Sequence, residues 1–394
     1  MPKYLDELNS SGKKVLLRCD FNVPLKGGQI DDDTRIREAL PTIKELLDGG
    51  AAIILMSHLG RPKGEVVKEL SLSVVAERLG ELLGRDIKFC PEITGDIARQ
   101  MASELKEGQV LLLENLRFDP GEKSNSPELA KELAGYADIF VQDAFGTAHR
   151  EHASMVGVPT QLPSYAGRLL QKEIDYLSKA LEPEHPFVVC LGGAKLETKI
   201  PVIENMMGRA DIILIGGGMA YTLMKAEGRE IGKSLFDRAN LEVAENILKK
   251  AEKSSTSIEL PVDHVIADDF DNPQKIENTD DAEIPEDMMA LDIGKKTGKL
   301  YRDKISGVKT LVFNGPMGVF EKEEFFKGTA AVIKAIIEAT EAGAVSIVGG
   351  GDTVSAITRL GFSKEKFTHV STGGGASLKF LEGKELPGIK VLNS

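Results

Sequence analysis

Short apolar runs rich in Val, Ile and Leu recur along the chain, and most are followed by residues with helical spacing. In SLSVVAERLGELLG, one helix face collects Leu72, Val75, Ala76, Leu79, Leu82 and Leu83. Apolar strands that alternate with helices predict parallel sheets covered by helices. Because single cores stop growing near roughly 250 to 300 residues, a chain of 394 residues is expected to form two domains.

Two helices have clear sequence boundaries. Ser126, Pro127 and Glu128 supply a cap, a first-turn proline and an acid that the helix dipole favours, and Gly135 follows as a stop. The segment RLLQKEIDYLSKALEPEHP, residues 168–186, predicts a helix that ends before Pro183. It lies between two different sets of motifs, so we interpret it as a connecting helix.

In the first half of the chain, the apolar runs end in charged or polar side chains. These are Arg18, Asp20, Asn22, His58, Arg61, Arg117, His149 and Arg150, with Arg35 nearby in DDDTRI. Ligands of open α/β sheets bind beyond the carboxyl ends of the strands, so these cations could converge in one crevice. This half is typical of a site for a small anion.

In the second half, the apolar runs end in glycine instead, in FVVCLGGAK, DIILIGGGMA, TLVFNGPMG, SIVGGGDT and HVSTGGGAS. Glycine lets a ligand approach the backbone closely, and N–H groups at a following helix N-terminus attract phosphate. A single such ending is often only a tight turn, but five indicate a cradle for a nucleotide polyphosphate. Two anionic ligands on two domains suggest group transfer between them.

Several residues of the glycine loops carry a specific hypothesis. Asp352 follows three glycines and is a candidate Mg²⁺ contact, since Mg²⁺ on a nucleotide takes only one or two protein carboxylates; its alternative role is a helix cap. Thr353 could hydrogen-bond a phosphate. Lys195 and Lys199 lie on one helix face and could follow a moving phosphoryl group, although two solvated lysines would give the same pattern.

Other motifs are incomplete. GREIGKS, residues 228–234, has three residues between its glycines where a phosphate-binding P-loop has four, and GGGMAYT lacks the GxGxxG spacing of dinucleotide sites. HREH matches no zinc-binding helix motif, so His149 and His152 are not expected to hold a metal. His58, at a strand end beside Ser57 and Arg61, is a better candidate for an anion contact, whereas a structural hydrogen bond is the alternative for His149 and the favoured role of His264 and His369.

Composition narrows the class of protein. A net charge of -12 without a basic stripe argues against a nucleic-acid partner. Cys19, Cys90 and Cys190 form no CxxC pair, which favours a reducing cytoplasm. The N-terminus MPKYLDELNS lacks the apolar run of a signal peptide, and no stretch approaches a membrane span. We therefore expect a cytoplasmic protein without a membrane partner.

The chemistry that these strand ends favour is phosphoryl transfer. The first half offers arginines but no clear general base, and an anionic acceptor such as a carboxylate needs none. Charge neutralisation and alignment are then sufficient.

The sequence closely resembles the phosphoglycerate kinase family over essentially its whole length. The resemblance rests on RCDFNVP, DDTRI, SHLGRP, LENLRF, DAFGTAHR, GGAK, GGGMA, FNGPMGVFE, GGGDT and STGGGAS, in the family's order. It implies reversible, Mg²⁺-dependent phosphoryl transfer in glycolysis, between 1,3-bisphosphoglycerate and ADP, giving 3-phosphoglycerate and ATP. It also implies a monomer whose domains close to exclude water.

The resemblance further implies the domain plan. Two doubly wound, Rossmann-like α/β domains with parallel sheets would be joined by a connecting helix and a hinge. Residues 1–167 would bind 3-phosphoglycerate, residues 168–186 would form the connecting helix, residues 187–379 would bind the nucleotide, and residues 380–394 would return to the first domain.

The family's functional residues are carried onto matching positions. Phosphoglycerate would contact Asp20, Phe21, Asn22, Arg35, His58, Leu59, Gly60, Arg61, Arg117 and Arg150. ATP or ADP would contact Gly193, Ala194, Lys195, Lys199, Gly294, Asn314, Glu321, Gly350, Gly351, Asp352 and Thr353, with Glu321 on the ribose and Asp352 beside Mg²⁺. The transferring group would be stabilised by Arg35, Lys195, Gly351 and Gly374.

Two positions depart from the family's pattern: Lys295 stands where relatives commonly have proline, and Glu151 where a small residue is common. Two other functions also remain open. One is a nucleotide-sensing binding protein without catalysis, against which Arg35, Lys195 and Asp352 all argue. The other is an NAD-dependent oxidoreductase, which the missing GxGxxG motif disfavours.

Overall fold

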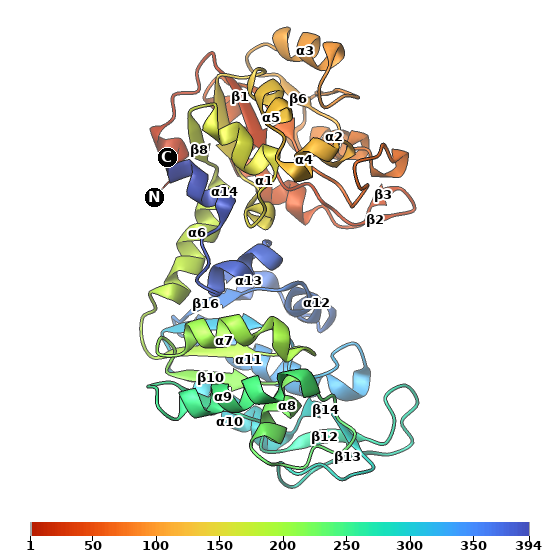
Figure 1. Ribbon diagram of the computed structural model, residues 1–394, viewed down its shortest axis with the longest axis vertical. Coiled ribbons are helices and arrows are strands. Elements are labelled where there is room, and N and C mark those ends of the chain that lie inside the picture. The colour runs from red at the N-terminus through yellow and green to blue at the C-terminus, as the bar shows by residue number, and fades with distance from the viewer. Residues whose placement is uncertain (1, 394) are drawn as a thin grey trace. The chain divides into compact units, whose positions relative to one another are not determined.

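The structure is a computed structural model that describes residues 2–393. The chain divides into two compact units, unit 1 comprising Met1–Ile174 with Glu385–Ser394, and unit 2 comprising Asp175–Lys384. Among residues 2–393, each unit holds one parallel sheet of six strands (Figure 1). The predicted fold class, two doubly wound α/β domains, is therefore confirmed. The boundary between Ile174 and Asp175 falls inside the expected connecting helix, residues 168–186.

The sheet of unit 1 has the strand order β5-β6-β4-β1-β7-β8. In that order the strands are Ile87–Phe89, Val110–Leu112, Ala52–Met56, Lys14–Arg18, Ile139–Gln142 and Ser164–Ala166. The central strands β1, β4 and β7 are almost entirely buried, which explains their unbroken apolar runs. The chain leaves β1 toward β4 and leaves β7 toward β8, so a topological switch point lies between β1 and β7.

The helices of unit 1 are α1 (Thr34–Asp48), α2 (Ser73–Leu83), α3 (Asp96–Ser103), α4 (Pro120–Ser124) and α5 (Pro127–Ala134), and a hairpin joins β2 (Leu25–Lys26) to β3 (Gln29–Ile30). The predicted face of α2 is buried at Val75, Ala76 and Leu79. The expected cap of α5 is confirmed, because the hydroxyl of Ser126 accepts a hydrogen bond of 3.3 Å from the N–H of Leu129.

Helix α6 (Arg168–Leu181) ends before Pro183, as the sequence predicts. Its first turn is capped from β7, since the buried carboxylate of Asp143 accepts hydrogen bonds from the N–H groups of Leu169 (2.9 Å) and Leu170 (3.1 Å). Burial raises the pKa of Asp143 to about 7, against the hydrogen bonds that the carboxylate accepts. The start of α6 is therefore tied to the sheet of unit 1.

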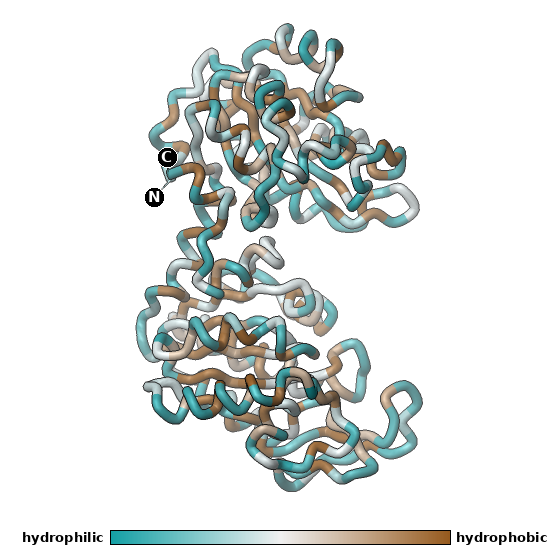
Figure 2. Tube along the Cα trace, viewed as in Figure 1, coloured by the Kyte–Doolittle hydropathy of each residue, from teal (hydrophilic) through white to brown (hydrophobic). Residues whose placement is uncertain are grey.

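The sheet of unit 2 has the strand order β11-β10-β9-β15-β16-β17. In that order the strands are Ser257–Glu259, Ile212–Ile215, Phe187–Leu191, Thr310–Asn314, Val345–Val348 and His369–Val370. The chain leaves β9 toward β10 and leaves β15 toward β16, so the switch point of this unit lies between β9 and β15. Figure 2 shows hydrophobic residues concentrated along these strands.

Six helices of unit 2 pack against one another in three pairs. Helix α8 packs on α9, α13 packs on α7, and α10 packs on α11. A separate antiparallel sheet has the order β13-β12-β14. The helices are α7 (Ile200–Met206), α8 (Met219–Ala226), α9 (Leu241–Ala251), α10 (Lys295–Ile305), α11 (Lys327–Glu341), α12 (Gly351–Arg359) and α13 (Gly375–Leu381), and the strands are β12 (His264–Ala267), β13 (Ile276–Asn278) and β14 (Met289–Ile293).

After α13 the chain returns to unit 1, where it forms α14 (Pro387–Lys390). The N–H of Gly388 donates a hydrogen bond of 2.9 Å to the carbonyl of Ala148, and Leu392 is buried. A Cβ on Gly388 would lie 2.9 Å from the methyl of Met155 and 3.1 Å from the Cα of Ala148, so this segment packs closely on the loop after β7. In Figure 1 the blue α14 lies beside the yellow-green elements of unit 1.

Candidate active site

The polar strand ends of unit 1 are held together by short hydrogen bonds around the end of β1. A guanidinium nitrogen of Arg35, on α1, lies 2.9 Å from a carboxylate oxygen of Asp20. The hydroxyl of Ser57, after β4, accepts from the N–H of Phe21 and donates to the carbonyl of Cys19, each at 2.8 Å. The loops after β1 and β4 are thereby locked to each other.

A second set of contacts brings in the loop after β6. The side-chain amide oxygen of Asn22 accepts from the N–H of Gly60 (2.8 Å), and Arg117 donates to the carbonyl of Gly60 (2.7 Å). Asn115 fixes Leu59 through hydrogen bonds to both its N–H and its carbonyl. The structure therefore brings Asp20, Phe21, Asn22, Arg35, His58, Leu59, Gly60 and Arg117 together, as the sequence predicts.

The electrostatics of this cluster favour an anionic ligand. Burial, and then the neighbouring charges of Arg150 and Arg18, lower the pKa of Arg117 to about 10. Within the described residues, the Nε of Arg117 is buried without a hydrogen-bond partner. Burial, and then Arg18, Arg117 and Arg35, hold the pKa of His58 well below its ordinary value. Cations this close repel one another, so binding of an anion among them lowers their electrostatic free energy.

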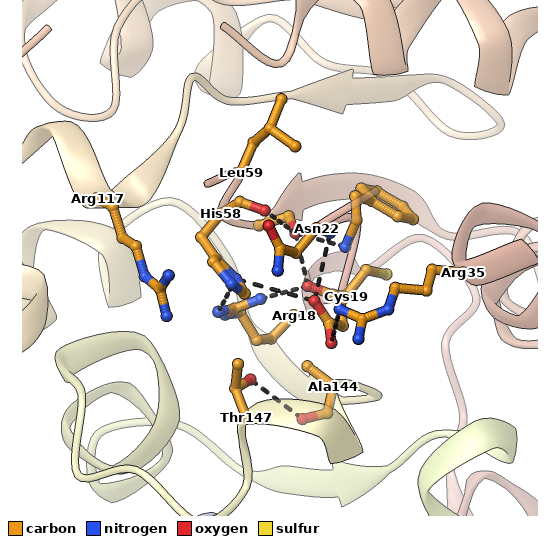
Figure 3. Close-up of polar contacts among 12 residues, drawn as sticks. Arg18, Cys19, Asn22, Arg35, His58, Leu59, Arg117, Ala144 and Thr147 are labelled. Carbon is orange, nitrogen blue, oxygen red and sulfur yellow. Dashed lines mark hydrogen bonds and ion pairs between the residues drawn. The ribbon is translucent and has the colours of Figure 1, made fainter. Parts of the chain in front are cut away.

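Figure 3 shows the side chains of Arg18, His58 and Arg35 gathered together, with Arg117 at one side. Arg150 and Arg61 are exposed at their strand ends. Arg18 contributes a buried charge, as its place among the polar strand ends suggested, although the family resemblance does not place it in the site. The cluster therefore combines the buried cations Arg18 and Arg117 with the partly exposed Arg35.

In unit 2, a cavity of about 310 Å³ lies at the switch point between β9 and β15. Its lining comprises Gly192, Gly193, Ala194, Lys195, Thr198, Lys199, Asn314, Gly315, Gly350, Gly351, Asp352 and Thr353. The loops after β9 and β15 touch here, since a Cβ on Gly192 would lie 2.1 Å from the carbonyl oxygen of Pro316. Only glycine allows this contact, which accounts for the glycine-ended runs of the sequence.

Helix α12 begins at this cavity. Gly350 precedes it with φ 95° and ψ 136°, a conformation that only glycine adopts readily. The first-turn N–H groups of Gly351, Asp352 and Thr353 lack partners within the helix by the geometry of an N-terminus, and they favour an anion. The hydroxyl of Thr353 is already engaged, accepting from Gly315 N–H (2.8 Å) and donating to the Gly349 carbonyl (2.7 Å). The backbone of Thr353, rather than its hydroxyl, is therefore available to a phosphate.

The two lysines of the sequence hypothesis differ in environment. Lys199 is half-buried and donates a hydrogen bond to the side-chain oxygen of Asn314. Burial lowers its pKa to about 8, although the charge of Asp352 acts in the opposite direction. Lys195 is exposed at the edge of the cavity. Both lysines lie where they could contact a phosphate chain.

A larger cavity of about 630 Å³ adjoins the first, because Gly193, Ala194 and Asp352 line both. It contains Glu321, as predicted, beside side chains that the sequence analysis did not assign, among them Tyr221, Lys233, Leu235, Phe270, Val319 and Phe320. Leu235 and Phe270 are 54% and 42% exposed. Exposed apolar residues that line a cavity are typical of a binding site, but sequence alone does not show their exposure.

Two predicted residues lie elsewhere. Gly294 precedes α10 and lines a different cavity with Lys295 and Lys299, and a Cβ there would clash with the carboxylate of Asp263. Ala290, on the same strand, lines the larger cavity instead. The structure therefore does not bring Gly294 together with the other nucleotide residues. Gly374 precedes α13 with φ 53°, four residues after the end of β17, and does not line either cavity among the described residues.

The metal hypothesis concerns an ion held mainly by the nucleotide. Asp352 is an exposed carboxylate at the junction of the two cavities, beside unpaired N–H groups, and this fits a single protein contact to such an ion. Among residues 2–393, no three His, Cys, Asp or Glu side chains are grouped as a metal site. No helix of this described range is long and apolar enough to cross a membrane.

Comparisons with known proteins agree with this geometry. The family model "Phosphoglycerate kinase" matches residues 5–384. The phosphoglycerate kinase of Thermosipho africanus is 55% identical, and the match covers 97% of this chain and 96% of that protein. The phosphoglycerate kinase of Chloroherpeton thalassium is 51% identical, and the match covers 100% of this chain and 99% of that protein. The structure of phosphoglycerate kinase from Coxiella burnetii superposes with a TM-score of 0.92 at 40% identity, covering 100% of this chain and 99% of that one. The chain therefore belongs to the phosphoglycerate kinase family of phosphotransferases.

Proposed function

We propose that this enzyme transfers a phosphoryl group reversibly between 1,3-bisphosphoglycerate and Mg²⁺-bound ADP, giving 3-phosphoglycerate and ATP. In the ATP-consuming direction, a carboxylate oxygen of 3-phosphoglycerate bonds to the γ-phosphorus, and the bond from that phosphorus to the bridging oxygen of ADP breaks. The single observation that carries the proposal is that the two units present different chemical groups. One unit gathers cations around buried His58, and the other offers glycine backbone and a helix N-terminus at a switch point.

The basic cluster of unit 1 would bind phosphoglycerate through Asp20, Asn22, Arg35, His58, Arg61, Arg117 and Arg150. The two adjoining cavities of unit 2 would bind the nucleotide, its adenosine end against Leu235 and Val319 and its phosphates against the start of α12. Mg²⁺ on the nucleotide would neutralise phosphate charge, and Asp352 is the residue that would contact it.

Arg35 and Lys195 would stabilise the transferring group, together with the backbone at Gly351 and Gly374. Arg35 belongs to unit 1 and the other three to unit 2, so transfer requires the units to close around both substrates. Closure would also exclude water, with which both ATP and an acyl phosphate react. We further propose that the enzyme acts as a monomer in cytoplasmic glycolysis.

The test is ATP consumption with Mg²⁺, measured with and without 3-phosphoglycerate while a coupled reduction removes the acyl phosphate. Consumption that depends on 3-phosphoglycerate supports the proposal. Nucleotide binding without consumption would instead favour a nucleotide-sensing binding protein, and the absence of both would show that the assignment of the glycine loops is wrong.

A further inference from the structure

The cation at the centre of unit 1 is Arg18, the last residue of β1, whose side chain is fully buried. Its Nε donates to the hydroxyl of Ser154 at 2.9 Å, and its Nη1 donates to the carbonyl of Cys19. Its Nη2 lies 3.4 Å from Nδ1 of His58. A guanidinium without solvent contact needs an opposite charge close by.

Of the two carboxylates whose charges act on Arg18, Asp20 has the smaller effect and Glu122, a fully buried residue of α4, the larger. Its carboxylate accepts from the hydroxyl of Ser154 at 2.6 Å and from the N–H of Ser154 at 3.0 Å. Burial alone would raise the pKa of Glu122, but His152, Arg18 and Ser154 hold it below its ordinary value. Glu122 is therefore ionised at neutral pH and balances Arg18 across one serine hydroxyl.

The chemistry of the groups fixes the direction of every hydrogen bond in this chain. A guanidinium only donates and an ionised carboxylate only accepts, so the hydroxyl of Ser154 gives its proton to Glu122 and accepts from Arg18. The same rule applies at the far end of Arg18. Facing a group that only donates, Nδ1 of His58 must accept.

The protonation of His58 follows from its surroundings. Burial and the cations Arg18, Arg117 and Arg35 lower its pKa, with His152 also contributing, so the imidazole is neutral. Asp20 is the only acid in an ion-pair distance to His58 among the described residues, and its oxygen lies 3.9 Å from Nδ1, too far to hold a proton there. A neutral imidazole whose Nδ1 accepts carries its proton on Nε2.

We infer that Glu122 is a positioning residue which, through Ser154 and Arg18, fixes His58 as a neutral imidazole with its proton on Nε2. This form donates a hydrogen bond from Nε2 to an anionic oxygen, whereas the opposite tautomer would present a lone pair to it. The inference deepens the proposed function and rests on it in one respect, namely that phosphoglycerate is the anion that His58 meets.

The direct test is ¹⁵N nuclear magnetic resonance of the imidazoles in the ligand-free protein, which distinguishes the two tautomers without any activity. Wild-type His58 is expected to show the Nε2–H form. Glu122→Gln removes the charge and Ser154→Ala removes the bridging hydroxyl, so in either variant the signal is expected to move toward the Nδ1–H form or an average of both. Glu128→Gln changes an exposed carboxylate on the next helix and is the matched control.

The kinetic readout separates positioning from a merely structural role. Loss of one charge-assisted hydrogen bond should raise the KM for 3-phosphoglycerate about tenfold, with the KM for ATP unchanged because the proposed nucleotide residues all belong to unit 2. A structural role alone would lower thermal stability and leave both the His58 tautomer and the ratio of the two KM values as in wild type.

Two results would overturn the inference: an Nδ1–H form of His58 in the wild type, or an unchanged Nε2–H form in both variants. If Glu122→Gln fails to fold, Ser154→Ala decides the question, since it retains both charges. If the wild type does not bind 3-phosphoglycerate, the proposed function fails, while the spectrum of the ligand-free protein still decides the tautomer.

Discussion

Replacing Arg35 by alanine tests the proposed reaction most directly. The guanidinium lies 2.9 Å from Asp20 and its side chain is 32% exposed, so it is held in place but can reach a ligand. Removing one preorganised charge from a transferring group typically costs about 10²–10³-fold in turnover, or about 3–4 kcal/mol. We therefore expect Arg35→Ala to lower kcat at least about 10²-fold.

The stability change should be far smaller. A partly exposed ion pair contributes about 0.2–1 kcal/mol, which corresponds to a shift in Tm of about 2–4 °C or less for a domain of this size. Arg78→Ala is a matched control, because Arg78 lies 2.7 Å from Asp33 and its side chain is 34% exposed. The control should show a similar Tm shift and normal turnover.

Arg35→Ala also leaves the carboxylate of Asp20 without its guanidinium partner. Asp20 is only 8% exposed, and its negative charge could itself repel phosphoglycerate. The double variant Arg35→Ala/Asp20→Asn removes that charge. If the double variant recovers wild-type kcat, or if Arg35→Ala alone retains turnover within severalfold of wild type, Arg35 does not stabilise the transferring group and our reasoning is wrong.

Three further predictions follow from individual groups. Lys199 loses its charge as pH rises through about 8, so the affinity for ADP, measured by calorimetry, should fall between about pH 7 and 9. Lys199→Met should abolish that pH dependence. A wild-type affinity that does not change over this range would contradict the assignment. The pKa of Asp143 is raised to about 7 from about 3.9 in the unfolded chain, so its contribution makes the unfolding free energy fall by about 2 kcal/mol from pH 5 to 7. Urea denaturation of Asp143→Asn should lack that decrease, and an identical pH profile would refute the shift. Gly350→Ala places a side chain at φ 95°, which costs about 1–3 kcal/mol. The affinity for ADP should therefore drop about tenfold or more, while the affinity for 3-phosphoglycerate, measured by the same calorimetry, is retained. Equal loss of both affinities would point to a global defect.

Much of the fold was predictable because the signals are local. An apolar run followed by helical spacing specifies a strand and a helix, and parallel strands place their carboxyl ends at one edge of a sheet. That rule sufficed to group Asp20, His58 and Arg117 in one unit, and Lys199, Asn314 and Asp352 in the other.

Gly294 is placed among the nucleotide residues by the family resemblance and not by this rule, and in the structure it lines another cavity. Its strand, β14, ends in glycine like the others, but it belongs to the antiparallel sheet β13-β12-β14 and not to the parallel one. Its end therefore faces a different cavity, while Ala290, on the strand itself, lines the cavity of about 630 Å³. Nothing in the residues around Gly294 distinguishes the two kinds of sheet.

Contacts between distant segments were also beyond sequence reasoning. Glu122 and Ser154 lie 32 residues apart in the sequence, and no periodicity indicates that they meet Arg18. Leu235 and Phe270 lie in irregular segments whose exposure depends on the folded surface. These residues are decided by tertiary packing, which local patterns do not encode.

The return of the last residues to unit 1 constrains the order in which the protein can mature during synthesis. A ribosome releases unit 2 as one continuous stretch, whereas α14, with its contacts to Ala148 and Met155, emerges only after all of unit 2 has been made. The unit that begins first is therefore completed last. A growing chain can hold a finished unit 2 while unit 1 still lacks the segment that packs against the loop after β7, so early release of incomplete chains would leave that loop unsupported.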